Sequence, residues 1–547
     1  MERNASREHG AAALLVSLLA LGVVAALFAL RGFDDNRLTS WSWIFARTHP
    51  LALFGVTAAA LGLAHALARF PLRRANVLFV FSLAAAACFW GEPEAIIDAS
   101  RYFTQAKHLE LHGAGFFLAQ WGREIPAWTD LPLVPFIYGL VFRLFGESRA
   151  CVQAVTTLFF AGTVVLAFRL GKLLWDEETG FAGGALLLAI PYLFTQVPAF
   201  LTDVPAMFFF TLAVYATAVA CQRGAIAWIL LASAAIVLAA LSKYSIWILL
   251  SVLPVVWLVW RRPRAGLAAF AIAGALMLVL LALRADVFSA QIALLSGYQA
   301  PGLRRWGESF ASTFFFQIHP FLTLAALVSL VLAVRRRDWR MAVVAWPVLL
   351  LLLLQVQRIR YLIPVFPMLA LMGARGLQAI RASRVRATVV TSAVFSSLAI
   401  AGFGYLPFLR STSAANLMAA GAYLDSLEEP RAHVLTSAEP DAEVNEAVDV
   451  PLLDLYTSKK LIYRDRTRQP PPGVERSALR FTWDWRTPAY YGPEDGPAAL
   501  VVISGRKAQP PPRGNYRLLR VFASDERVFA HTTFVSVYRR EPKGGDI

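Results

Sequence analysis

Residues 261–284 read RRPRAGLAAFAIAGALMLVLLALR, in which a cluster of arginines precedes an uncharged run that ends at Arg284. A helix of about 20 apolar residues is long enough to cross the hydrocarbon core of a membrane. Similar runs recur along most of the 547-residue chain, and hydrophobic residues make up 57% of it. Charged residues make up 16%, against about a quarter in soluble domains. The sequence therefore predicts a polytopic helical membrane protein and excludes a soluble enzyme or a disordered chain.

The apolar runs predict thirteen membrane-spanning helices. They are expected at 11–30, 50–68, 77–91, 150–170, 181–200, 204–221, 225–241, 245–260, 265–284, 319–334, 341–356, 361–376 and 387–406. The run Leu131–Gly146 is not counted, because Pro132 and Pro135 interrupt it and it carries Arg143. We expect this run to form a juxtamembrane helix.

Basic loops predict the orientation of these spans. The formal net charge is +16, and short basic gaps separate apolar runs at 73–74, 261–264, 335–337 and 381–386. With the N-terminus inside, all four clusters are cytoplasmic, as the positive-inside rule requires. Counting 131–146 as a span would place three of them outside. The basic excess is thus explained by membrane topology, and no nucleic-acid partner is expected.

Polar segments on the extracytoplasmic side follow from the same orientation. They are 92–148, the turn at 202–203, the loop 285–318, the segment 355–360 and everything after 408. The N-terminal part, 1–76, supplies two spans, and the transmembrane catalytic part is expected in 77–408. High alanine and arginine content favours a bacterium with GC-rich DNA, hence an inner-membrane protein with its last part in the periplasm.

Residues 411–547 differ in composition from the rest of the chain. Proline-rich linkers occur at Pro470–Pro472 and Pro510–Pro512, and Ala414–Leu427 has the pattern of an amphipathic helix. Apolar runs of strand length follow at Ala432–Leu435, Ala498–Ile503, Tyr516–Phe522 and Thr533–Tyr538. The sequence predicts a small extracytoplasmic α/β domain here.

Two carboxylates on the outer face are costly so close to hydrocarbon, which indicates a functional role. Asp98 begins a stretch in which Tyr102 and Leu109 recur at helical spacing, and Asp203 stands just before Pro205. Each also fits the position of a helix N-cap, for which Asp is a preferred residue. Either reading is compatible with the sequence alone.

Cations gather on the same face. Lys243 ends an apolar run, where it suits either a snorkelling side chain or a phosphate ligand. Arg358 and Arg360 stand at the mouth of a proline-broken span, and Arg304 and Arg305 lie in the loop 285–318. Because topology alone would favour the opposite face for arginine, these residues indicate an anion site.

Other motifs that could indicate a metal, nucleotide or nucleophile site are weak. His108 and His112 have the spacing of a shared metal site but no obvious third ligand, and two unconnected histidines are the simpler interpretation. No glycine-rich phosphate loop or serine nucleophile elbow occurs in a convincing context, so no nucleotide cofactor is expected. Whether a divalent metal takes part stays open.

The motifs, taken in order, resemble those of the GT-C membrane glycosyltransferases, in particular the protein mannosyltransferases that use dolichyl-phosphate-mannose and the bacterial aminoarabinose transferases. The matching motifs are Asp98-x-x-x-Tyr102-x-x-x-Ala106, Leu131-Pro132-Leu133, Thr202-Asp203-Val204-Pro205, Leu241-Ser242-Lys243-Tyr244 and Arg360-Tyr361-Leu362-x-Pro364-x-x-Pro367. The resemblance covers about residues 77–408.

The resemblance implies a helical bundle with a catalytic cavity at its outer face and a sugar donor carried on a polyprenyl phosphate. It implies an inverting hexosyl or pentosyl transfer to a lipid, glycan or protein acceptor. Asp98 would be the general base, with its pKa expected to be raised by desolvation. Asp203 would be a second catalytic residue that orients the acceptor, a metal or the helix of Asp98. The substrate-binding residues would be Tyr102, Lys243, Arg304, Arg305, Arg358, Arg360 and Tyr361, of which the cations would stabilise the leaving phosphate.

Two other functions share some of these sequence features. A secondary transporter also places charges near broken helices, but it should show internal repeats and midplane charges. A ligase or polymerase of the O-antigen type uses the same lipid carriers and relies on arginines in large outer loops rather than on an aspartate in the first loop.

Overall fold

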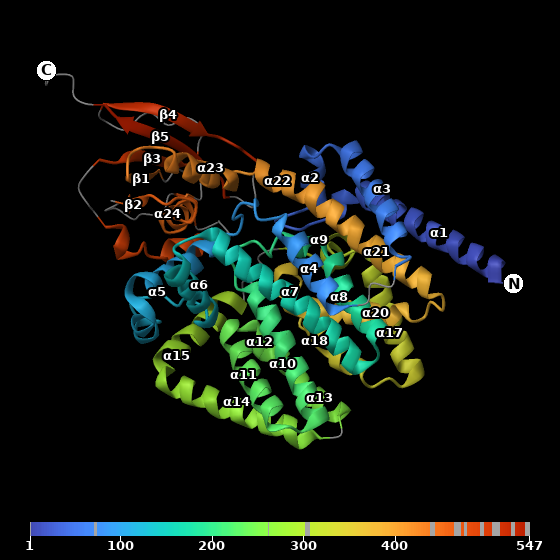
Figure 1. Ribbon diagram of the computed structural model, residues 1–547. Coiled ribbons are helices and arrows are strands. Elements are labelled where there is room, and N and C mark those ends of the chain that lie inside the picture. The colour runs from blue at the N-terminus through green and yellow to red at the C-terminus, as the bar shows by residue number, and fades with distance from the viewer. Residues whose placement is uncertain are drawn as a thin grey trace.

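A computed structural model describes residues 2–70, 74–260, 262–300, 307–437, 444–463, 472–474, 479–492, 497–505, 515–526 and 531–541. A bundle of helices forms the larger part of the molecule, and the C-terminal sheet lies at one end of it (Figure 1). The predicted class, a helical membrane protein with a C-terminal α/β domain, is confirmed.

Six helices of the described chain are long and apolar enough to cross a membrane. They are α1 (Glu2–Ala29, apolar from Gly10), α3 (Pro50–Leu67), α7 (Arg149–Leu174), α10 (Asp203–Arg223), α14 (Pro263–Leu283) and α21 (Ser383–Ile400, continuing to Ser411). Shorter helices of the bundle are α4 (Ala75–Ala87), α11 (Ile226–Ser242), α12 (Ser245–Leu249), α13 (Val252–Val259), α17 (Pro320–Arg336), α18 (Met341–Leu353) and α20 (Phe366–Leu377). The number of thirteen spans therefore stays a prediction.

The expectation of one continuous helix over 181–200 is wrong. The chain forms α8 (Glu177–Leu186), a 3-10 turn η2 (Leu187–Ala189) and the short α9 (Pro191–Phe194). Pro191 lacks an N–H and disfavours helical geometry at Ile190, which is extended at φ −119° and ψ 91°. The carbonyl oxygen of Ala189 accepts a hydrogen bond from the His319 amide, so the freed backbone is partly satisfied by another helix.

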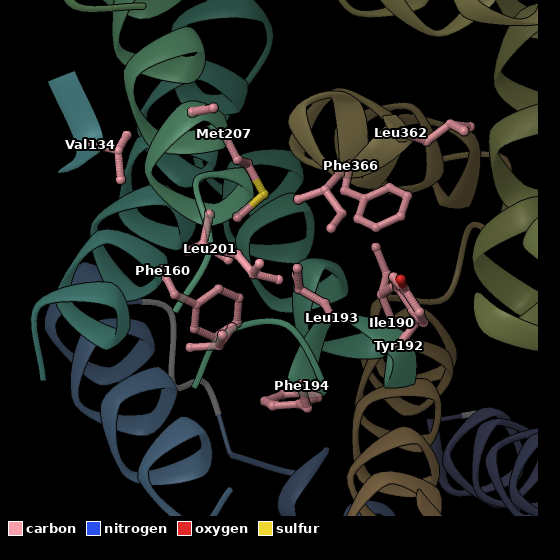
Figure 2. Packing of buried hydrophobic residues seen from close by; sticks show 14 of the residues in the cluster. Val134, Phe160, Ile190, Tyr192, Leu193, Phe194, Leu201, Met207, Leu362 and Phe366 are labelled. Carbon is pink, nitrogen blue, oxygen red and sulfur yellow. The ribbon is translucent and has the colours of Figure 1, made fainter. Parts of the chain in front are cut away.

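This broken segment packs in the centre of the core. Figure 2 shows Leu193 and Phe194 among aromatic and aliphatic side chains from α7, α10 and α20. The span expected at 361–376 is interrupted in the same way, as α19 (Ile359–Leu362), η5 (Ile363–Val365) and α20. Both interruptions end helices inside the bundle. The second one produces the short helix α19, which carries Arg360.

Two helices lie between the bundle and the C-terminal domain (Figure 1). They are α5 (Asp98–Gln120), kinked at Gly113 where φ is +86°, and α6 (Leu133–Phe145). A helix is thus present in the run 131–146, and its juxtamembrane position stays a prediction. A side chain at Gly139 of α6 would come within 2.6 Å of Leu109, so this glycine allows the two helices to pack closely. Three further segments lie around this end of the bundle, namely α2 (Trp41–Arg47), α15 (Ala285–Leu294) and the π-helical turn η4 (Ser312–Gln317).

The C-terminal domain is a mixed five-stranded sheet with strand order β2-β1-β3-β5-β4. The strands are β1 (Arg431–Ser437), β2 (Lys460–Tyr463), β3 (Ala499–Ser504), β4 (Tyr516–Phe522) and β5 (Phe534–Arg540). Strands β2, β1 and β3 are parallel, whereas β5 runs antiparallel to both β3 and β4. The predicted strands and the helix α23 (Ala414–Asp425) are present, while β2 and α24 (Glu446–Asp454) were not predicted.

Candidate active site

Four helix ends meet at the end of the bundle that carries the C-terminal domain. These are the first residues of α5 and α10, the C-cap of α11, and the short α19. A cavity of about 620 Å³ lies between them. The predicted site residues on its wall are Asp98, Tyr102, Lys243, Arg358, Arg360 and Tyr361. Arg304 and Arg305 lie outside the described residues.

The carboxylate of Asp98 faces this cavity and does not cap its helix. Asp98 is the first residue of α5, the N-cap position is Ile97, and no side-chain capping bond forms there. Its Oδ2 accepts a hydrogen bond from Arg360 Nη1 at 2.5 Å, and its Oδ1 lies 3.5 Å from Arg101 Nη1. The side chain is 22% exposed. Asp98 is thus held by cations while one side remains open to a substrate.

Asp203 lies behind these cations. Its side chain is fully buried, and Thr202 occupies the N-cap position of α10 without a capping bond. Oδ2 accepts a hydrogen bond from Arg360 Nε at 2.9 Å, and Oδ1 forms an ion pair with Lys243. Arg360 therefore bridges the two aspartates, and the capping interpretation of both is wrong.

The pKa of Asp98 is lowered, which corrects the expectation of a raised value. Burial alone would raise this pKa, but the positive charges of Arg360, Arg101 and Arg358 together hold it below its usual range. The sequence shows the desolvated position of the acid, but it does not show that three guanidinium groups surround it. In this state the carboxylate is ionised at neutral pH.

Arg101 and Asp130 also belong to the cavity wall, and both were missed. The guanidinium of Arg101 forms a bidentate pair with Asp130, including Nη2 to Oδ1 at 2.8 Å, and Gln105 Nε2 donates to Asp130 Oδ2 at 3.0 Å. The signal was present in the spacing, since Asp98, Arg101 and Gln105 lie three and four residues apart and so share one face of α5. Arg101 was not predicted, because it lies in a polar segment, where a charged residue is common.

The C-terminal domain supplies part of the wall. Phe481, in the 3-10 turn η8 (Arg480–Asp484), lines the cavity, and the ring of Trp485 lies 4.7 Å from the guanidinium carbon of Arg101. This is the distance of a cation–π contact. The domain therefore covers the cavity with an aromatic surface, which no sequence motif indicated.

Tyr361 lies between two cations. Its ring centre is 5.4 Å from Lys243 Nζ and 5.4 Å from the guanidinium carbon of Arg358. Glu308 Oε2 accepts a hydrogen bond from the Ile359 amide at 3.1 Å and so ties the loop before α17 to the arginine segment. These contacts fix the segment that carries Arg358 and Arg360.

The two histidines remain apart from this cavity wall. The ring centres of His108 and His112 are 6.0 Å apart, and His108 packs against Tyr490 of the C-terminal domain. Burial and the neighbouring His112 lower the pKa of His108 to about 4. Within the described ranges, no group of three or more His, Cys, Asp or Glu side chains is placed to hold a metal ion.

Comparisons with known proteins find similarity to one family model and to several solved structures. Residues 129–289 match the model of the dolichyl-phosphate-mannose-protein mannosyltransferase family. ArnT from Cupriavidus metallidurans bound to undecaprenyl phosphate is similar in structure, with a TM-score of 0.52 and 13% identity over 84% of this chain and 97% of that chain. The oligosaccharyltransferase AglB from Archaeoglobus fulgidus, in complex with an inhibitory peptide and a dolichol-phosphate, gives a TM-score of 0.47 and 12% identity over 79% and 69%.

A comparison with curated proteins gives no match. The similarity to ArnT shows a GT-C fold, and the expected resemblance to membrane glycosyltransferases that use polyprenyl-phosphate sugars is confirmed. The chain is a multi-pass membrane protein of this fold.

Proposed function

We propose that this protein is an inverting glycosyltransferase that moves a sugar from a polyprenyl-phosphate donor to an extracytoplasmic lipid, glycan or protein acceptor. The observation that carries the proposal is the Asp98 carboxylate, open to a cavity and flanked by Arg101 and Arg360. It supplies a proton acceptor beside groups that stabilise a phosphate. We place the protein in a bacterial inner membrane, with residues 411–547 on the periplasmic side.

The reaction is a single displacement. An acceptor hydroxyl oxygen attacks the anomeric carbon, its proton passes to Asp98, and the bond from that carbon to the phosphate oxygen breaks. Attack opposite the leaving group inverts the anomeric centre. The phosphate leaves as the polyprenyl phosphate, and Lys243, Arg358 and Arg360 stabilise its charge.

Donor binding would also prepare the base. In the unliganded site Arg360 donates to both aspartates, which makes Asp98 a weak proton acceptor. A phosphate that approaches Arg360 gives this guanidinium a third anion and adds negative charge beside Asp98. Both effects raise the pKa of Asp98, since a nearby anion disfavours ionisation. The carboxylate then accepts a proton more readily when donor is present.

The apolar side of the cavity suits the carrier lipid. Ile248, Ile292 and Leu354 line the cavity and are 45%, 52% and 47% exposed. Exposed aliphatic side chains beside a group of cations match a molecule with an isoprenoid chain and a phosphate. We assign this side to the first isoprene units of the donor.

Asp203 acts as a positioning residue in this scheme. It is fully buried and holds Arg360 and Lys243 in place from behind. The acceptor would enter beneath the aromatic surface of the C-terminal domain, where Phe481 stands on the wall.

The test is a transfer assay with purified protein in detergent, given a radiolabelled polyprenyl-phosphate sugar with and without membrane extract as the acceptor source. Asp98→Asn should lower transfer by about 10²- to 10⁴-fold, the range expected for loss of a general base. Asp286→Asn is the matched control, because Asp286 is 60% exposed and pairs loosely with Arg123 at 3.8 Å. Equal transfer by wild type and Asp98→Asn would overturn the assignment, and no use of any lipid-linked sugar by the wild type would overturn the function.

A further inference from the structure

A second cavity, of about 520 Å³, lies at the opposite end of the helical bundle. Its wall includes Arg69 after α3, Val77 at the start of α4, and Arg384 at the start of α21. Helix α21 begins beside this cavity, since Arg384 is on its wall. The helix runs from there toward the C-terminal domain (Figure 1). The second cavity is thus remote from the catalytic one and lies at the end that the basic loops predict to be cytoplasmic.

Most of the side chains on the wall of this cavity are apolar and graded in exposure, and Glu178 is the carboxylate among them. Phe70 and Val77, at the entrance, are 62% and 36% exposed, whereas Leu78, Leu188 and Val394 are buried. Such walls offer water few polar partners, so an apolar cavity of this size is poorly suited to ordered water. We call this cavity the slot, because its exposed and buried apolar side chains suit a hydrocarbon chain that enters from the bilayer.

Two guanidinium groups stand at the rim of the slot. In the described part of the chain no carboxylate or carbonyl group pairs with the side chain of Arg69 or Arg384. Arg386 is the third arginine on the cavity wall. It differs from the other two, because it forms an ion pair with Glu178 at 2.6 Å and donates to the Ile380 carbonyl. Arg386 therefore has a structural role, while the other two leave positive charge available beside an apolar slot.

We propose that this cavity binds an anionic phospholipid of the membrane, with one acyl chain in the slot and the headgroup phosphate against Arg69 and Arg384. A phospholipid is favoured over the polyprenyl-phosphate carrier because the cavity lies in the predicted cytoplasmic leaflet. That leaflet is rich in anionic phospholipids, and basic pockets between helices on this side recognise their headgroups. The proposed transfer reaction, by contrast, takes place at the other face.

The test is native mass spectrometry of the full-length protein in mild detergent, incubated with equal amounts of phosphatidylglycerol and phosphatidylcholine that carry the same acyl chains. The wild type should retain one phosphatidylglycerol in preference to phosphatidylcholine. Each arginine near an anionic lipid contributes roughly a fivefold effect, so Arg69→Gln with Arg384→Gln should lower the preference by at least about tenfold.

The matched control is Arg335→Gln with Arg336→Gln, which removes the same charge from the same end of the bundle at exposed positions outside the cavity. It should retain the wild-type preference. Ala182→Phe fills the slot while keeping both arginines, and it should lose the bound lipid. Equal retention of both lipids by the wild type, an equal loss in the control, or displacement of phosphatidylglycerol by an equal amount of polyprenyl phosphate would each overturn the proposal.

Discussion

Helix α5 carries two ion clusters with opposite charge balance. The cavity cluster, at its first turn, places four cations around three carboxylates, namely Arg101, Lys243, Arg358 and Arg360 around Asp98, Asp130 and Asp203. The interface cluster, further along the same helix, places Glu147 and Asp454 around a single lysine, Lys107, which joins α5 to the C-terminal domain. Both clusters are largely buried, so burial alone does not distinguish them.

The protonation of the two clusters differs because of this balance. Burial favours the neutral form of every carboxylate, but three guanidinium groups outweigh it at Asp98 and lower its pKa. At the interface, burial and the negative charge of Asp454 raise the pKa of Glu147 to about 8, and Lys107 offsets only part of this. The number of cations within reach thus decides which buried acid is ionised at neutral pH.

The largest expected effect comes from removing the bridge between the two aspartates. Arg360→Gln leaves Asp98 without its closest cation and removes a ligand for the leaving phosphate, so transfer should fall by about 10²- to 10³-fold. The pKa of Asp98 should rise, and the acidic limb of the pH–rate profile should move to higher pH. An unmoved acidic limb in this variant would contradict the base role of Asp98.

Arg360→Lys is the matching control for this bridge. It retains the positive charge, but an ammonium group has no planar fork with which to hold both carboxylates. Transfer should recover only in part, and the acidic limb should lie between those of wild type and Arg360→Gln. Full recovery would show that charge alone matters and that the bridge does not.

The next effect is expected at Asp203. Asp203→Asn removes the buried anion that holds Arg360 and Lys243, and breaking a buried pair typically costs about 3–5 kcal/mol of stability. A lower melting temperature should accompany a fall in kcat, with a smaller change in the KM for donor. A normal kcat in a folded Asp203→Asn protein would remove the positioning role.

The interface cluster predicts a pH dependence of stability with the opposite sign from that of a typical salt bridge. The pKa of Glu147 is raised to about 8 in the folded protein, whereas the unfolded chain releases this proton near 4.5. Stability should therefore fall as pH rises from about 4.5 through 8. Glu147→Gln should lessen this slope in melting temperature, while Glu177→Gln, in an exposed pair with Lys172, should leave it unchanged.

The smallest effect is expected where the two parts of the molecule meet over the cavity. Phe481→Ala removes an aromatic wall but no charge, so transfer should fall only severalfold, mainly through a higher KM for the acceptor. Steady-state kinetics at varied acceptor concentration separates this effect from a change in donor binding. A loss as large as that of Arg360→Gln would mean that the domain takes part in the chemistry.

Much of the cavity cluster was predicted because its residues are charges at the ends of apolar runs. Asp98, Lys243 and Arg360 stand out in this way, since hydrocarbon makes any nearby charge unusual. Their pairing was not predicted, because Asp98 and Arg360 are 262 positions apart and meet only through the packing of the bundle. Phe481 was missed for a related reason, because one aromatic residue in an α/β domain has no distinctive pattern.

The fold was predicted in class but not in every helix. Pro191 and Pro364 are visible in the sequence, yet a proline kinks some membrane helices and ends others. The outcome depends on whether another segment satisfies the freed backbone groups, as His319 does for Ala189. That partner lies more than a hundred residues away, so local sequence does not reveal it.

The role of Asp98 as the base is tested most directly by a single-turnover transfer experiment in which donor binding and chemistry are measured separately. Wild-type and Asp98→Asn protein are first saturated with polyprenyl-phosphate sugar and are then mixed with acceptor. The variant should bind donor within a few-fold of wild type, because the cations remain, and its transfer rate should fall at least about a hundredfold. A variant that binds donor and transfers the sugar at the wild-type rate would show that Asp98 is not the base.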